Sequence, residues 1–246
     1  ACSVAIAITS CQAGQYSIGN PSNEEQLYLE YINRARADAV AESRRLAAET
    51  DSSIRQYYSS FGIDPQDIIF QFTTSVADGT FAGSAQPLSF NAKLLDMAGY
   101  HSQDMFNNTF QGHVSSSNPP APFLPGYTLG QRAQAVGYSY SALAENVYAY
   151  SKSVKFGHAG FDVDWGADSP SKSGYNPAFA GQGMQNPAGH RKAIHNNNYK
   201  EIGVGVVSGS NGGVGPQIVT QDFGKSGSAT FVTGVVQVCS DIAQRL

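Results

Sequence analysis

Two histidines and a glutamate stand out as residues that could do chemistry: His113, Glu145 and His190. Each lies at the edge of a predicted helix or strand, beside glycine or another small residue, so its side chain can point into a cleft. Two neutral imidazoles and one carboxylate form a ligand set that zinc accepts, with one position left for water. The spacing alone does not show that the three residues meet, and each could instead be a hydrogen-bonded structural residue.

Other chemistries find little support in the sequence. It contains no G-x-S-x-G, H-E-x-x-H or Walker motif, and no G-x-G-x-x-G after a strand. Asp162, Asp164, Gly166 and Asp168 suggest a calcium loop, because hard cations prefer oxygen ligands. The glycine stands one place early and no bidentate glutamate follows, which favours a solvated loop.

The other three histidines are expected to be structural or exposed. We expect His101 to face the core or to cap a helix turn. His158 and His195 are predicted to face solvent, and His158 lies near enough to Asp162 to pair with it on one helix face.

The composition indicates a folded domain with a weakly charged surface. Of 246 residues, 41% are hydrophobic and only 14% are charged, with a formal net charge of −4. The hydrophobic fraction is enough for a core and excludes wholesale disorder. The 15 Lys and Arg are scattered, so a nucleic-acid partner is not expected. No apolar run approaches a membrane span; the longest is residues 4–8.

Hydrophobic periodicity and turn residues place helices first and adjacent strands last, which predicts an α+β domain with an antiparallel sheet. Segment 22–48 begins with a capping box of Ser22 and Glu25 and is predicted to form one helix. Further helices are expected over 54–61, from 64–65 onward, from 91 to before Gly112, over 159–165 and over 187–196. Loops are predicted at 114–140 and 166–183, and strands at 202–207, 217–221 and 230–238.

Five segments, in order along the chain, resemble motifs of the CAP superfamily, also called SCP-like, and its bacterial branch in particular. They are Tyr28-Leu-Glu-Tyr-Ile-Asn-Arg-Ala-Arg36, Pro87-Leu-Ser-Phe-Asn-Ala-Lys-Leu94 through His113, Ala144-Glu-Asn-Val147, Pro187-Ala-Gly-His-Arg191 and Tyr199-Lys-Glu-Ile-Gly-Val-Gly205. The resemblance spans about residues 22–224. Ala144 stands where the family's G-E-N motif has glycine.

The resemblance implies a three-layer α-β-α sandwich with a small antiparallel sheet and a central cleft. It also implies that His113, His190 and Glu145 line this cleft with a second acid, which is Asp164 or else Asp162. In several family members the cleft holds a divalent metal. For this chain the resemblance implies zinc first, with calcium or magnesium as alternatives. Asp is one methylene shorter than the family's usual glutamate at this position.

The chain is interpreted as an N-terminal extension (1–21), a CAP domain (22–228) with an insertion at about 50–86, and a C-terminal strand and tail (229–246). The resemblance implies a secreted, periplasmic or cell-surface protein that acts by binding a lipid, a glycan or a protein partner. One alternative is a metal-dependent extracellular hydrolase with Glu145 as general base. Another is a structural subunit of an extracellular assembly, in which the terminal segments support self-assembly. Cys2, Cys11 and Cys239 allow more than one disulfide pairing.

Overall fold

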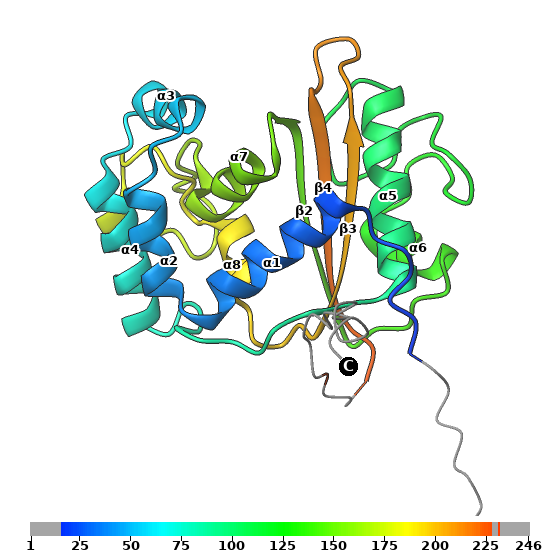
Figure 1. The fold of residues 1–246 in the computed structure, drawn as a ribbon, viewed down its shortest axis with the longest axis horizontal. Coiled ribbons are helices and arrows are strands. Elements are labelled where there is room, and N and C mark those ends of the chain that lie inside the picture. The colour runs from blue at the N-terminus through cyan, green and yellow to red at the C-terminus, as the bar shows by residue number, and fades with distance from the viewer. Residues whose placement is uncertain (1–15, 228–230, 232–246) are drawn as a thin grey trace, which may run out of the picture.

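The protein folds into layers of helices on the two sides of one small sheet (Figure 1). The structure is a computed structural model that describes residues 16–227 and residue 231. The three cysteines and the strand predicted at 230–238 therefore lie outside the described part, except for Phe231.

The sheet contains four strands in the order β1-β3-β4-β2. Strands β2 (Ala142–Ser151), β3 (Glu201–Ser208) and β4 (Gln217–Lys225) pair antiparallel, and β3 and β4 form the predicted hairpin. The two-residue strand β1 (Ser89–Phe90) pairs parallel with β3, which makes the whole sheet mixed. Strand β2 had no counterpart among the strands predicted from the sequence.

Helix α5 (Ala92–Asn107) covers one face of the sheet, and glycines in β3 allow it to lie very close. A Cβ atom at Gly203 would lie 2.0 Å from the Leu94 carbonyl group, and one at Gly205 would lie 2.2 Å from the carbonyl carbon of Ala98. Alternate strand residues face opposite sides, so Val204 points into the other half of the core. The glycines thus fix the distance between α5 and the sheet.

Helices α1 (Asn23–Ala37), α7 (Val154–Ala159) and α8 (Gly189–His195) lie on the opposite face (Figure 1). The predicted capping box is present, since the Glu25 amide donates to the Ser22 hydroxyl and the Ser22 amide donates to the Glu25 carboxylate. The three-layer α-β-α arrangement expected from the sequence is therefore present.

Segment 22–48 forms two helices, so the prediction of one continuous helix is wrong. The backbone of Asp38 is extended, and its carboxylate accepts a hydrogen bond from the Ala41 amide at 2.8 Å. This side chain caps helix α2 (Ala39–Ala47), which therefore begins in a new direction.

Helices α3 (Ser52–Phe61) and α4 (Pro65–Ala77) form where they were predicted. Asp51 and Asp64 cap their N-termini, and Pro65 occupies the first turn of α4. Their apolar residues pack against α7 and the segment after it, in a cluster that includes Tyr58, Phe72 and Trp165. Segment 50–86 is thus joined to the CAP-like region by a shared core.

Three further segments differ from the prediction. Helix α6 (Leu129–Ala135) forms inside the predicted loop 114–140, capped by Thr128 and Gln131. The helix expected to include residues 159–165 begins as α7 and continues as a π-helix, η1 (Gly160–Asp164), so it ends one residue before Trp165. A 3-10 turn, η2 (Pro177–Phe179), lies in the predicted loop 166–183. Among the helices that the structure describes, none is long and apolar enough to cross a membrane.

Candidate functional site

His113 and Glu145 meet at the edge of the sheet. His113 lies in the loop that follows α5, and Glu145 lies in β2. The His113 Nδ1 atom is 2.9 Å from Glu145 Oε1. The imidazole is 58% exposed, whereas the carboxylate is 1% exposed. A buried acid therefore holds an exposed imidazole in place.

The Glu145 carboxylate is shared with two more basic groups. The Arg132 guanidinium of α6, itself fully buried, donates to Glu145 Oε2. His101 Nε2 lies 3.8 Å from the same oxygen and 2.8 Å from the Gly112 carbonyl oxygen. Burial alone would raise the pKa of Glu145, but the hydrogen bond with His113 and the neighbouring positive charges hold it below its ordinary value. Glu145 is therefore an ionised and fully engaged carboxylate.

His190 and Asp164 form a second pair of the same kind. Asp164 ends the π-helix η1, and His190 lies in the first turn of α8. The His190 Nδ1 atom is 2.7 Å from Asp164 Oδ1, and the His190 amide donates to Asp164 Oδ2 at 3.0 Å. Burial lowers the pKa of His190, but the charge of Asp164 more than offsets this, so the pKa is raised. The shorter aspartate thus reaches the histidine.

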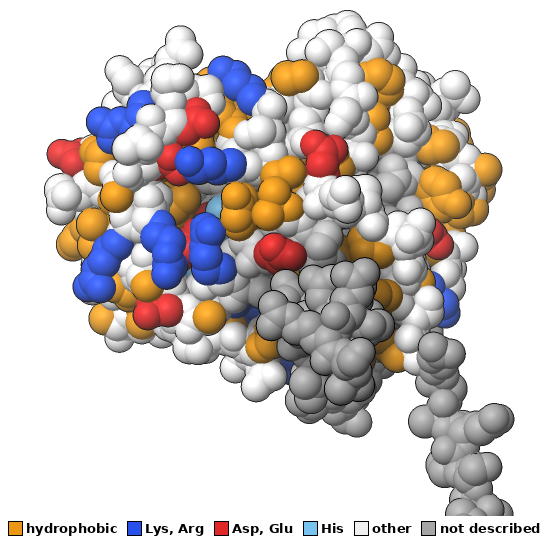
Figure 2. All heavy atoms as spheres, in the orientation of Figure 1, with side chains coloured by type: hydrophobic (Ala, Val, Ile, Leu, Met, Phe, Trp, Pro, Cys, Tyr) orange, Lys and Arg blue, Asp and Glu red, His pale blue; other side chains and the backbone are white. Residues whose placement is uncertain are grey.

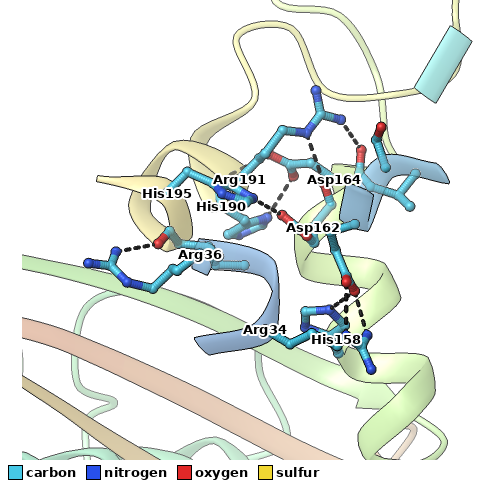
Figure 3. Close-up of polar contacts among 12 residues, drawn as sticks. Arg34, Arg36, His158, Asp162, Asp164, His190, Arg191 and His195 are labelled. Carbon is cyan, nitrogen blue, oxygen red and sulfur yellow. Dashed lines mark hydrogen bonds and ion pairs between the residues drawn. The ribbon is translucent and has the colours of Figure 1, made fainter. Parts of the chain in front are cut away.

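An unusual backbone conformation turns Asp164 toward His190. Its φ angle is 60°, which non-glycine residues adopt rarely and which aspartate tolerates better than most. Such strained conformations, like π-helices, gather at functional sites. Figure 3 shows Asp164 facing His190, while the nearby Asp162 faces His195.

Each histidine uses Nδ1 for its carboxylate, and its Nε2 makes no hydrogen bond to any described residue. A carboxylate on one ring nitrogen that leaves the other free is the usual arrangement of metal-binding histidines. Each of these two imidazoles is therefore oriented as a metal ligand would be, and imidazole nitrogen suits zinc. Glu145 and Asp164 act in this geometry as carboxylates that orient the two imidazoles. Direct metal ligation by these two acids stays a prediction.

A different group of residues brings its potential ligand atoms closest together. Within the described part of the chain, only Glu42, His158 and Asp162 place three such atoms within 4.8 Å of one another. This buried Glu/His/Asp group could hold a metal ion. Glu42, however, also accepts hydrogen bonds from Arg34 and Arg45, and these positive charges oppose a cation.

The prediction that His158 and His195 face solvent is wrong. The side chains are 3% and 0% exposed, respectively. His158 Nε2 lies 3.0 Å from Glu42 Oε1, and His195 Nε2 lies 2.8 Å from Asp162 Oδ1. The hydrogen-bond partner of Asp162 is therefore His195 of α8 (Figure 3). His101, in contrast, is buried as predicted.

The acidic residues of the suggested calcium loop form hydrogen bonds with other groups of the protein. Asp162 and Asp164 are fully buried and each pairs with a histidine, while Asp168 accepts a hydrogen bond from the Gly181 amide at 2.7 Å. The interpretation of this segment as a solvated loop is therefore wrong for Asp162 and Asp164. Their side chains build the interface between η1 and α8.

A groove with a cavity of about 300 Å³ opens beside His190. Most of its wall is aromatic and comes from α3, β2 and the end of the η1 segment: Tyr57, Phe61, Tyr148, Tyr150 and Trp165. Two glutamine side chains, Gln111 and Gln185, complete its polar lining with His190. His113 lies two residues after Gln111 and does not line this cavity.

Two buried site residues were missed from the sequence. Arg132 lay in the predicted loop 114–140, and its neighbours Gln131 and Gln134 gave no apolar pattern that could have indicated it. Asp222 of β4 is the register partner of Glu145 on the neighbouring strand β2, and it is fully buried. Burial and the nearby charge of Glu145 raise the pKa of Asp222 well above its ordinary value. It lies just beyond the predicted strand 217–221, after Thr220 and Gln221, so no apolar pattern in the sequence indicated its burial.

An α-β-α sandwich with two histidine–carboxylate pairs, one of them beside a groove, fits a CAP-like domain. Comparison with protein families gives the same result, since residues 29–223 match the cysteine-rich secretory protein family, CAP. The chain therefore belongs to this family, as predicted. No curated protein matches the chain significantly.

One solved structure is similar to this chain: an extracellular protein containing an SCP domain from Bacillus anthracis str. Ames. The sequence identity is 20% and the TM-score is 0.35. The alignment covers 72% of this chain and 44% of that protein, so this chain spans less than half of its length.

Proposed function

We propose that this protein is a secreted or cell-envelope CAP-domain protein that binds a ligand in the groove beside His190, with a divalent metal held by His113 and His190. The observation that carries the metal assignment is the matched pair of histidines. Each has Nδ1 held by a buried carboxylate and Nε2 free of described partners. His158 and His195 also pair with carboxylates, but through Nε2, and their remaining ring nitrogen is buried. The imidazoles of His113 and His190 are instead 58% and 22% exposed, so a metal can reach them.

Zinc fits the proposed donors best. Imidazole nitrogen suits zinc, whereas calcium and magnesium prefer oxygen ligands. When bound, zinc would supply a Lewis-acidic centre with open positions for a ligand or water. His113 and His190 would hold it, and Glu145 and Asp164 would fix the tautomers by occupying Nδ1.

Binding is favoured over hydrolysis by the surroundings of Glu145. A general base needs a carboxylate that can take a proton from a water near the substrate. Glu145 is 1% exposed, is engaged by His113 and Arg132, and has a lowered pKa. These features suit an orienting group and oppose a proton acceptor, so we place Glu145 as a positioning residue.

Secretion is proposed on two supports. Only 14% of residues are charged, which is common outside the cell, and the family is that of cysteine-rich secretory proteins. Self-assembly through the terminal segments stays a prediction, because residues 1–15 and 232–246 lie outside the described part.

The metal proposal is tested by titrating zinc into the metal-free protein in a calorimeter. Metal analysis then measures how much zinc stays bound. We expect saturable binding by the wild type and its loss in the His113→Ala/His190→Ala double variant. The matched control is His158→Ala, which removes a histidine of the Glu42 group and should retain zinc binding. Absence of zinc binding by the wild type would contradict the proposal, and so would its loss in His158→Ala alone. Melting temperatures of all variants show that each is folded.

A further inference from the structure

The groove beside His190 has an aromatic wall built from three separate parts of the chain. Tyr57 of α3 lies 5.2 Å, centroid to centroid, from Trp165, which follows η1. Tyr148 of β2 lies 6.3 Å from Trp165 and 6.4 Å from Tyr150. The rings therefore form one continuous surface.

Part of this surface is open to solvent. Phe61 and Tyr150 are 41% and 43% exposed, whereas Trp165 is 7% exposed. Exposed aromatic rings gathered at a groove mark binding sites more often than scattered ones do. Helix α3 belongs to segment 50–86, so a segment predicted as an insertion supplies one side of the groove.

The polar part of the groove offers hydrogen bonds without net charge. Gln111 Oε1 accepts from the Ala149 amide at 2.8 Å, which leaves its amide nitrogen without a partner among the described residues. The Gln185 side chain likewise has no hydrogen-bond partner in the described part of the chain. No Asp, Glu, Lys or Arg lines the cavity, and the ammonium group of Lys152 lies over the Tyr57 ring.

The positively charged side chains that the structure describes lie outside the lining of this groove. Figure 2 shows that the Lys and Arg side chains on this face gather mostly over the helical half formed by α1, α2 and α3. Several of them are already paired, such as Arg34 and Arg45 with Glu42 and Lys155 with Glu49. These groups do not line the groove. The Lys152 ammonium group lies over the Tyr57 ring, but the described lining itself offers no Lys or Arg to an anionic ligand.

We infer that this groove binds a neutral saccharide, with pyranose rings stacked on its exposed aromatic rings, Phe61 and Tyr150. Aromatic faces carry a negative electrostatic potential that attracts the weakly positive C–H groups of a sugar ring. Amides such as Gln111 and Gln185 can donate to and accept from hydroxyl groups. A cavity of about 300 Å³ is at the small end of ligand pockets and suits a short oligosaccharide. The wall has few aliphatic side chains, which disfavours a lipid chain.

This inference specifies the ligand class of the proposed binding function and rests on it for the groove, but it does not require the metal. Trp165 is the only tryptophan in the chain and lines the groove, so its fluorescence reports occupancy. The experiment titrates the whole chain with cellotriose, maltotriose, mannotriose and chitotriose, each to roughly 10 mM to include weak binding. We expect a saturable change with at least one of them.

Two pairs of variants test whether binding occurs at this wall. Phe61→Ala and Tyr150→Ala should each weaken binding about tenfold, since loss of one stacking surface has an effect of this order. Their controls are Phe70→Ala and Tyr140→Ala, because these rings are 45% and 42% exposed and do not line the groove. The controls should bind like the wild type.

The outcomes separate this inference from the metal proposal. His113→Ala should lose zinc and retain the saccharide, because His113 does not line the groove. Zinc binding without saccharide binding would overturn the inference and leave the metal proposal standing. Saccharide binding without zinc binding would support the inference and contradict the metal proposal. A response to a fatty acid or to a peptide alone, or equal losses in the control variants, would also overturn the inference.

Discussion

Replacing Asp164 by asparagine tests whether this buried carboxylate prepares His190 to bind a metal. Asparagine has nearly the same shape and tolerates the φ angle of 60°, so the backbone should be retained. The aspartate, however, accepts from two donors, His190 Nδ1 at 2.7 Å and the His190 amide at 3.0 Å. Asparagine offers only one acceptor oxygen, so one donor must face its NH₂ group.

The expected loss of zinc affinity follows from this broken contact. Removing a carboxylate that orients a ligating histidine typically weakens metal binding 10- to 100-fold, or about 1.4 to 2.7 kcal/mol. We expect Asp164→Asn to fall in this range in a zinc competition assay at pH 7.5. The matched control is Asp162→Asn, an equally buried residue that pairs with His195, and it should leave the affinity unchanged.

The pH dependence gives a second readout with a defined sign. Protons compete with zinc for His190, and Asp164 raises the pKa of this imidazole above its ordinary value of 6.5. Zinc affinity of the wild type should therefore decline once the pH falls through that raised pKa. In Asp164→Asn the decline should begin at a lower pH. If Asp162→Asn lost zinc while Asp164→Asn retained it, the metal would belong to the Glu42 group and the reasoning would be refuted.

Two further predictions concern stability. Gly203→Ala should destabilise the protein by roughly 3 kcal/mol or more, because the new Cβ would lie 2.0 Å from the Leu94 carbonyl group. Gly99→Ala in α5 is the control, since no atom lies within 4 Å of its new Cβ, and urea denaturation should show equal or greater stability. The second prediction concerns the acid stability that Glu42 provides. Burial alone would raise the pKa of Glu42, but its hydrogen bonds with His158 and Arg34 outweigh burial and lower the pKa to about 2. Its contribution of about 3 kcal/mol is present above pH 4.5 and should be lost as the pH falls toward 2. Glu42→Gln should remove this part of the pH dependence, and an unchanged acid profile in the variant would contradict the assignment.

Local signals in the sequence predicted much of the fold. The capping box at Ser22 and the Gly-rich turn between β3 and β4 act within a few residues, so their structures could be inferred directly. The break at Asp38 was missed because both flanking helices have suitable periodicity. An aspartate in such a run can either face solvent or cap a new helix, and only the tertiary position of α2 decides between them.

Contacts between distant residues explain what the sequence alone did not predict at the site. His158 and His195 appeared exposed because their partners, Glu42 and Asp162, are respectively 116 and 33 residues away in sequence. Arg132 likewise meets Glu145 only after α6 has packed beside β2. The motif order, in contrast, indicated His113, Glu145, His190 and Asp164. The structure arranges these four residues as two pairs.

The segment η1 explains how one short stretch can serve both the core and the groove. Asp162 and Asp164 are two residues apart, yet one faces His195 and the other faces His190 of the same helix, α8 (Figure 3). A regular α-helix would rotate the second side chain by about 200° from the first. The wider π-helix and the positive φ angle at Asp164 instead bring both carboxylates onto α8. The backbone strain at Asp164 is therefore offset by the two hydrogen bonds from His190, and losing them should loosen the start of α8 before the core.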